Sequence, residues 1–192
     1  MQLGTLQVII CSTRPGRVGA KIGRWFAEFA QLDLTSKVEV VDLGQIDLPV
    51  LNEPEHPASG RYVHQHTKEW SAIVSRGDAF VFVIPEYNHS YNSAVKNAID
   101  YLHVEWRNKA VGFVSYGGVS AGTRAVQALK PVFLSVKAVP VLESVNIPFV
   151  STHFDANGSF VPSPQMCATA KSMIEELCRL DSLMQELRPA GT

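Results

Sequence analysis

Three nearly continuous apolar runs constrain the fold of this chain most strongly: Leu6–Ile10, Ala79–Ile84 and Ala110–Val114. Such runs are typical of parallel strands that are covered on both faces, because a strand with one wet face alternates polar and apolar residues. Lys37–Asp42 begins with that alternation and predicts an edge strand. A shorter run at Val139–Leu142 predicts a fifth strand. The chain therefore indicates an α/β fold with a five-stranded parallel sheet.

Segments with helical periodicity separate these strands. The first helix starts at about Ala20 and places Ile22, Trp25, Phe26 and Phe29 on one face. Further helices are expected at His64–Arg76, Ser93–Val104, Thr123–Val136 and Gln165–Leu187, and Pro131 lies inside the third of these four. The edge strand follows the first strand directly, which predicts the strand order 2-1-3-4-5 of flavodoxin-like folds, with helices on both faces.

Length and composition agree with one domain over residues 1–192, since 46% hydrophobic residues can build a sizeable core. A formal net charge of −1 argues against a nucleic-acid partner. We find neither a signal segment nor an apolar stretch long enough to span a bilayer, so no membrane partner is expected. Three cysteines without metal-ligand spacing favour free thiols and the cytoplasm.

The loop after the first apolar run has the composition of an anion site. Ser12 and Thr13 offer hydroxyl donors, and Arg14 and Arg17 offer planar donors that suit a phosphate. The following helix directs its unpaired N–H groups and its positive dipole end at this loop. Neither a G-x-G-x-x-G nor a Gly-Lys-Ser/Thr motif is present, which favours a single terminal phosphate over a dinucleotide or a triphosphate. The alternative is an ordinary turn with solvated arginines.

Two more unusual loops follow the central strands, where ligands bind in open α/β sheets. Pro85–Ser93 is polar and aromatic at once, so its tyrosines can face a planar ligand and Ser93 can cap the next helix. Ser115–Gly122 combines an aromatic residue with adjacent glycines, which permit positive backbone angles and a close approach of ligand to main chain. For this third loop, a simple helix-entry turn remains an equal alternative.

A phosphate loop, an aromatic wall and a glycine floor describe a flavin mononucleotide site, and here the chain resembles the flavodoxin-like NADPH-dependent FMN reductases, which include chromate, quinone and azo-dye reductases. The resemblance covers roughly residues 6–142 and is most specific at Pro85-Glu86-Tyr87-Asn88 and Lys96-Asn97-Ala98-Ile99-Asp100. It implies FMN contacts from Ser12, Arg14, Arg17, Val18 and Gly19 at the phosphate, from Pro85, Glu86, Tyr87 and Asn88 along the ribityl chain and ring, and from Ser115, Tyr116, Gly117 and Gly118. The family usually has glycine where Cys11 stands, so a tighter or strained first turn is expected.

The resemblance also implies a mechanism. Hydride passes from NADPH or NADH to the flavin and then to a small-molecule acceptor on the same face, without a catalytic acid or base. Backbone N–H groups near Tyr87–Asn88 and Gly117–Gly118 are expected to stabilise the reduced ring. His89 and Tyr91 are candidates to touch nicotinamide or substrate, or else they only pack at a subunit contact. The family further implies a homodimer or homotetramer that completes the pocket.

Three other interpretations need separate tests. Cys11 and Arg17 match the Cys-x5-Arg spacing of phosphotyrosine phosphatases, although valine follows Arg17 and no Asp-Pro pair stands near the C-terminus. A flavodoxin-like electron carrier would also bind FMN, but such carriers are usually strongly acidic. His64 and His66 lie two residues apart on a predicted helix, so they are expected to point to different faces and to make a poor metal pair.

Overall fold

The computed structural model describes residues 3–188. Five parallel strands form one sheet in the order β2-β1-β3-β4-β5, which confirms the predicted α/β class and strand order. The strands are β1 (Leu6–Ile10), β2 (Val38–Asp42), β3 (Ala79–Pro85), β4 (Ala110–Tyr116) and β5 (Val139–Ile147). Because all five strands run in the same direction, the loops after β1, β3 and β4 leave the sheet at one edge.

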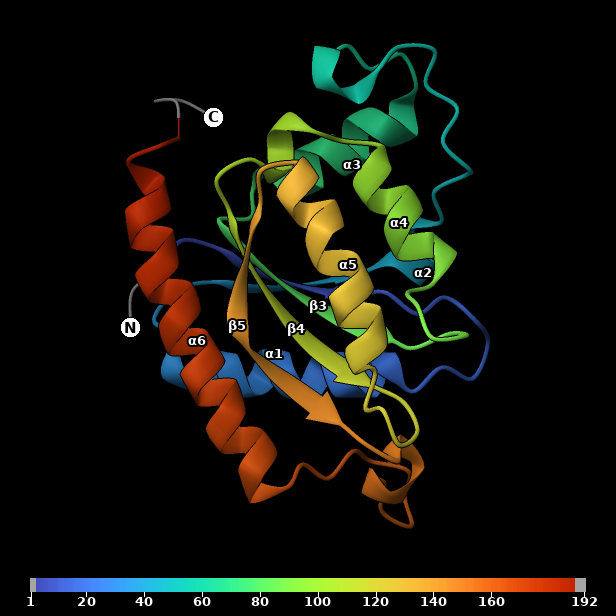
Figure 1. The fold of residues 1–192 in the computed structure, drawn as a ribbon, viewed down its shortest axis with the longest axis vertical. Helices are drawn as coiled ribbons and strands as arrows, with labels where there is room; N and C mark the ends of the chain where they lie inside the picture. The colour runs from blue at the N-terminus through green and yellow to red at the C-terminus, as the bar shows by residue number, and fades with distance from the viewer. Residues whose placement is uncertain (1–2, 189–192) are drawn as a thin grey trace.

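Helices cover both faces of the sheet. They are α1 (Gly19–Asp33), α2 (Leu43–Ile46), α3 (Gln65–Ser75), α4 (Ser93–Asp100), α5 (Thr123–Ser135) and α6 (Pro164–Gln185), with short 3₁₀ turns at Pro57–Ser59, Val104–Trp106 and Val150–His153. Helices α1 and α6 lie on one face, and α3, α4 and α5 lie on the other (Figure 1). Within residues 3–188, no helix has both the length and the hydropathy needed to cross a membrane.

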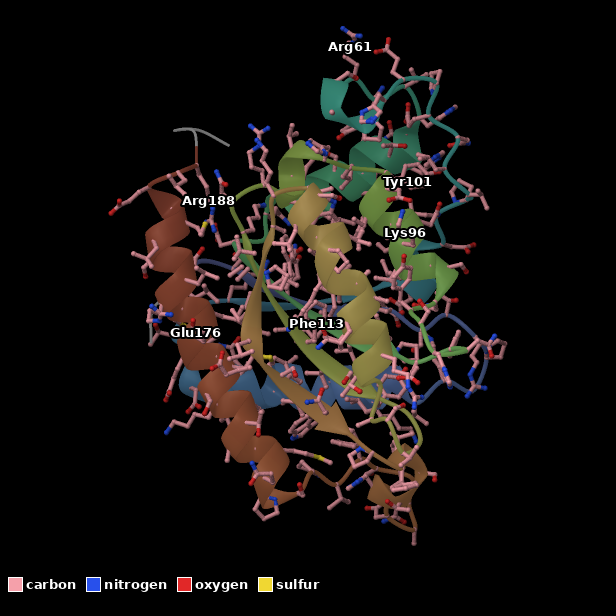
Figure 2. The ribbon with its side chains drawn as sticks, viewed as in Figure 1. Arg61, Lys96, Tyr101, Phe113, Glu176 and Arg188 are labelled. Atoms are coloured by element: carbon pink, nitrogen blue, oxygen red, sulfur yellow. The ribbon has the colours of Figure 1, made fainter. Side chains whose placement is uncertain are left out.

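Each face of the sheet carries its own hydrophobic core. On the α1 side Ile22 and Phe26 are fully buried, and Trp25 and Phe29 pack at the margin, as the helical period predicts. The opposite core is aromatic: the ring of Phe133 on α5 lies 4.7 Å from Phe82 and 5.9 Å from Phe113, measured between centroids. Figure 2 shows Phe113 near the middle of the molecule, between β4 and α5. Burying each such side chain stabilises the fold by about 1.5–3 kcal/mol.

Two predicted boundaries differ from the structure by four or more residues. Helix α4 ends at Asp100, four residues early, because Tyr101 and Leu102 are drawn into the core and the chain turns to bury Trp106, whose indole N–H donates to the carbonyl of Ile99. Strand β5 continues to Ile147, five residues beyond the predicted end. This edge strand mixes buried, half-buried and exposed residues, so polar residues such as Glu143 interrupt the apolar run and its continuation cannot be recognised from apolar residues alone.

Candidate functional site at the carboxyl edge of the sheet

The first loop presents an open helix N-terminus. Cys11 and Ser12 are buried, whereas residues 13–16 are exposed. Helix α1 begins at Gly19, and its N-cap residue Val18 has an apolar side chain that cannot accept a hydrogen bond from the first turn. The N–H groups of that turn, together with the positive end of the helix dipole, can therefore receive an anion.

Gly19 lies where the first loop meets β4. A Cβ atom at this position would lie 2.4 Å from Ser12 Oγ and 2.5 Å from the Tyr116 hydroxyl oxygen, so any other residue would displace these two hydroxyl groups. Among the described residues, the buried Ser12 Oγ has no hydrogen-bond partner of standard geometry. Burial raises the pKa of Tyr116, and the nearby Ser12 hydroxyl opposes that shift. An orphaned hydroxyl beside an open helix N-terminus fits a phosphate, although Ser12 faces inward in this structure.

The two arginines of the loop have different surroundings. Arg14 is exposed. Arg17 forms an ion pair with Asp42, with Nη2 2.7 Å from Oδ2, and its Nη1 donates to the carbonyl of Ser12 at 3.2 Å. It also packs on Gly44, where a Cβ would lie 2.9 Å from Nη2. Arg17 thus braces the loop against the end of β2, and Arg14 is the guanidinium that remains free to meet a ligand.

The second loop is a tight two-residue turn. The N–H of Tyr87 donates to the carbonyl of Ser90 at 2.9 Å, and the N–H of Ser90 donates back at 3.0 Å. Asn88 and His89 between them have φ values of 49° and 65°, the left-handed pair that such turns require. Both residues are exposed at the tip of the turn, and Pro85 before it is the last residue of β3.

The Glu86 side chain faces α5. Its Oε1 lies 2.9 Å from Nη1 of Arg124, and its Oε2 accepts the Arg124 backbone N–H at the first turn of that helix. Burial works against its ionisation, but hydrogen bonds from Ser120 and Arg124 outweigh burial and lower the pKa of Glu86. In this structure Glu86 joins the second loop to α5, and Arg124, which the sequence analysis did not single out, is its partner.

The third loop starts later than its sequence pattern predicts. Ser115 and Tyr116 are the last residues of β4, and the buried Ser115 hydroxyl donates to the carbonyl of Ala121 at 2.8 Å. The positive φ angles expected at the first glycines occur instead at Ala121 and Gly122. A Cβ at Gly122 would lie 2.7 Å from the Tyr116 nitrogen, so this glycine makes the tight return.

Gly117 and Gly118 lie beside the second loop, since Pro85 pairs with Tyr116 across β3 and β4. We call the surface formed by Tyr87, Asn88, Gly117 and Gly118 the loop ledge. A Cβ at Gly118 would meet no atom within 4 Å, so this part of the loop ledge is open. The N–H groups of Tyr87 and Gly117 already donate to Ser90 and Ile147. Four backbone N–H groups were expected to stabilise a bound ring, and of these the N–H groups of Asn88 and Gly118 remain candidates to donate to it.

Asn92 is a structural link that the sequence analysis missed. Its buried Nδ2 donates to the carbonyl of Cys11 at 2.7 Å and so ties the first loop to the start of α4. Asn92 is also the N-cap residue of α4, which makes Ser93 the first helical residue rather than the cap. An asparagine directly before the helical period was the available signal.

A cleft of about 640 Å³ adjoins the first loop on the helical side. It is lined by Thr13, Tyr91, the α2 region (Leu43, Asp47, Leu48, Val50) and α4 (Ser93, Ala94, Lys96, Asn97, Ala98, Asp100). Of the residues predicted to contact a ligand, Thr13 of the first loop and Tyr91 line it, whereas His89 lies at the turn tip. The cleft is thus distinct from the loop ledge.

Cys11 has the surroundings of a structural residue. Its thiol is fully buried, and Sγ donates to the carbonyl of Ile9 at 3.5 Å. Burial raises the pKa of the Cys11 thiol well above its ordinary value, the opposite of what a thiolate nucleophile needs. Its backbone does not adopt the left-handed conformation, so the expected strain in the first turn is absent at this residue.

The histidine pair differs from its predicted arrangement. The rings of His64 and His66 stack at 5.2 Å between centroids instead of facing different ways. The physical reason is that His64 is the N-cap residue of α3 with an extended backbone, outside the helical period. Residues 3–188 contain no group of three or more His, Cys, Asp or Glu side chains placed to hold a metal ion.

Sequence comparison relates the chain to flavin-dependent reductases. Residues 5–152 match the family model described as NADPH-dependent FMN reductase. An NAD(P)H-dependent FMN reductase of Schizosaccharomyces pombe is 37% identical over 145 residues, which cover 73% of this chain and 72% of that protein. A quinone reductase of Pseudomonas putida is 31% identical over 153 residues, covering 74% and 77% of the two chains.

Structural comparison agrees on the fold. A flavoenzyme NAD(P)H:(acceptor) oxidoreductase of Paracoccus denitrificans superposes with a TM-score of 0.69 at 22% identity, over 95% of this chain and 97% of that one. A Megasphaera elsdenii flavodoxin superposes with a TM-score of 0.55 at 13% identity, over 88% and 98%. Reductases and carriers thus share this fold, and the choice between them depends on the sequence match and the site.

Proposed function

This chain belongs to the NADPH-dependent FMN reductase family, and from that membership we propose that it passes electrons from NAD(P)H through bound FMN to a small-molecule acceptor such as a flavin, quinone, azo compound or metal oxyanion. One observation carries the proposal: the open N-terminus of α1 and the loop ledge meet at one edge of the sheet. An anion site beside an open, partly aromatic surface suits a phosphorylated planar cofactor.

Each part of the site has a proposed task. The N–H groups of the first turn of α1 and the exposed Arg14 would hold the FMN phosphate, while Arg17 keeps the loop in shape through Asp42. Tyr87 and Gly118 would face the ring, and the N–H groups of Asn88 and Gly118 would donate to its polar edge. When bound, FMN supplies the ability to take two electrons from a nicotinamide and to release them singly or together. The protein binds and orients, and no side chain is assigned as acid or base.

The exposed turn tip supports a role in substrate contact. His89 is exposed beside the loop ledge, and Tyr91 is half-buried in the adjoining cleft. We assign both to contacts with the nicotinamide or the acceptor. Donor and acceptor would then occupy the same open side of the loop ledge in turn.

We further propose that residues 1–192 form one FMN-binding domain that works as a homodimer or homotetramer in the cytoplasm. The loop ledge is open, and the neighbouring cleft has apolar lining from Leu43, Leu48 and Val50, so a second copy would supply a wall that one chain lacks. Three free cysteines support a reducing compartment. Light scattering of the FMN-loaded protein tests the assembly, and a monomer would contradict it.

The deciding experiment is the absorption spectrum of the purified protein under anaerobic conditions. We expect a yellow protein whose visible flavin band bleaches on addition of NADPH and returns when a quinone is added. FMN bound without any response to NADPH or NADH would favour the electron-carrier alternative. Failure to bind FMN in a fluorescence titration would overturn the proposed function.

A further inference from the structure

Phe149 adopts a backbone conformation that a bulky side chain rarely tolerates. It has φ 45° and ψ 50°, in the left-handed region, at the start of the short turn Val150–His153. For an aromatic residue this is a true outlier, since glycine and asparagine populate the region at far lower cost. Such strain persists only where the surrounding structure enforces it, and it concentrates at functional sites.

The surroundings that enforce it belong to the third loop. The N–H of Phe149 donates to the carbonyl of Gly118 at 3.0 Å, and the N–H of Val150 donates to the carbonyl of Gly117 at 3.0 Å. The Phe149 carbonyl accepts from the backbone N–H and the hydroxyl of Thr152, both at 2.9 Å. The backbone of Phe149 is therefore fixed directly against two residues of the loop ledge.

Phe149 is exposed, with 57% of the residue's surface accessible. The nearby rings of Phe154 and Phe160 pack on each other at 5.6 Å, and Phe160 packs on Trp25 at 5.1 Å, so apolar burial is available in this region. Phe149 is less buried than these rings, which pack against the core. Glycine or asparagine would fulfil the backbone role with less strain and without an exposed ring, so the fold alone does not explain phenylalanine here.

Exposed apolar side chains follow three neighbouring strands at this edge. Tyr87 after β3 is 37% exposed, Val119 after β4 is 76% exposed, and Phe149 comes after β5. In strand order Tyr87 and Phe149 come from the two sides of Gly117 and Gly118, and Val119 follows Gly118 directly. A flat, apolar molecule lying on the loop ledge would meet such surface on the β5 side as well as on the β3 side.

We propose that Phe149 is a specificity-determining residue, whose ring forms the wall on the β5 side against which a planar aromatic electron acceptor packs. This inference rests on the proposed function and deepens it, because it names the acceptor class that the site favours. Aromatic pairs contribute about 0.5–1.5 kcal/mol beyond the area they bury. A non-aromatic acceptor such as ferricyanide gains nothing from the ring.

Equilibrium binding of 1,4-naphthoquinone to the oxidised, FMN-loaded protein without a donor tests the inference by calorimetry. Phe149→Ala should raise the dissociation constant about 2- to 13-fold, and Phe149→Tyr should retain the wild-type value. In turnover, the KM for naphthoquinone should rise by a similar factor, while kcat and the ferricyanide reaction stay unchanged. Leu134→Ala, a similarly exposed apolar residue (59%) on α5, is the matched control and should have no effect.

Urea unfolding of the flavin-free protein measures the backbone strain at Phe149. Phe149→Gly should have a higher urea midpoint than Phe149→Ala, since glycine accepts the left-handed conformation and alanine does not. The reverse order would overturn the inference, as would unchanged naphthoquinone binding in Phe149→Ala alongside an active wild type. A wild-type protein that binds no FMN would overturn the proposed function, and the inference with it.

Discussion

The two arginines of the first loop, Arg14 and Arg17, differ in whether their side chains are already held by other residues. Arg14 is exposed, whereas Arg17 is held by Asp42 and by the carbonyl of Ser12. Both arginines fit a phosphate by chemistry, but only Arg14 is free to bind one without breaking an existing contact. This difference is measurable because binding and folding can be assayed separately.

Arg14→Ala should weaken FMN binding about 10- to 150-fold, the effect of losing a charge-assisted hydrogen bond, and leave the urea midpoint unchanged. Arg17→Ala should lower both the FMN affinity and the urea midpoint, because the loop loses its brace. Fluorescence quenching gives the affinities, and riboflavin, which lacks the phosphate, should bind wild type much more weakly than FMN. Equal affinities for FMN and riboflavin would contradict this placement of the phosphate.

Cys11→Ser should retain FMN and most NADPH oxidation. The thiol is buried and its pKa is raised by burial, so we expect its sulfur to take no part in the chemistry. The wild-type protein should show no vanadate-sensitive hydrolysis of p-nitrophenyl phosphate. Hydrolysis that the substitution abolishes would instead assign Cys11 as a phosphatase nucleophile.

At the scale of the elements, the loop from β4 to α5 has space for a side chain near its start and none near its end. A side chain at Gly118 would meet open space, whereas one at Gly122 would collide with the main chain at Tyr116. Gly118→Val should therefore prevent the flavin ring from reaching the main chain without unfolding the protein. Circular dichroism checks the fold and an FMN titration checks binding. Wild-type affinity in this variant would exclude Gly118 from the floor of the site.

The junction of α3 and β4 carries a buried ammonium group. Lys109 Nζ donates to the carbonyls of Val74 and Ser75 at the end of α3, at 3.1 and 3.3 Å. Burial, with a smaller contribution from Arg188, lowers the pKa of Lys109 to about 8, against opposing contributions from Asp78 and other carboxylates. The folded state thus loses this proton at lower pH than the unfolded chain does.

The shifted pKa of Lys109 makes the free energy of unfolding depend on pH. Between the folded pKa and the unfolded value of about 10.4, the unfolded state binds more protons, so the contribution of Lys109 to stability increases with pH. The free energy of unfolding of wild type minus that of Lys109→Met should increase by roughly 1 kcal/mol from about pH 7 to about pH 9. Urea titrations at each pH measure it, with Lys68→Met, an exposed site on α3, as the control. A constant difference would contradict the shifted pKa.

At the scale of the whole molecule, we propose that the loop ledge receives both the electron donor and the electron acceptor. If the two use it in turn, initial rates with NADPH and a quinone should give parallel lines in double-reciprocal plots. Intersecting lines would show that both bind together and would contradict a shared position. The same plots for Phe149→Ala should remain parallel, because that variant changes affinity and not the order of events.

Much of this architecture follows from local pattern. Apolar runs and helical periods are properties of neighbouring residues, so the strands, their order and the meeting of three loops at one sheet edge were predictable from the sequence. The start of α1 directly after the first loop was predictable for the same reason. The boundaries of α4 and β5 were not, because the packing of Trp106 and the pairing of β5 depend on distant segments.

The direction of the site side chains depends on the tertiary structure. Arg17 meets Asp42, Glu86 meets Arg124 and Asn92 meets Cys11, and each partner lies 25 or more residues away in the chain. Sequence pattern identifies the residue types that can bind a phosphate or a ring, but the same types also pair with each other. Only the folded chain decides which donors are consumed internally and which stay open. It also brings Phe149, unremarkable in the sequence, against Gly118 in a strained conformation.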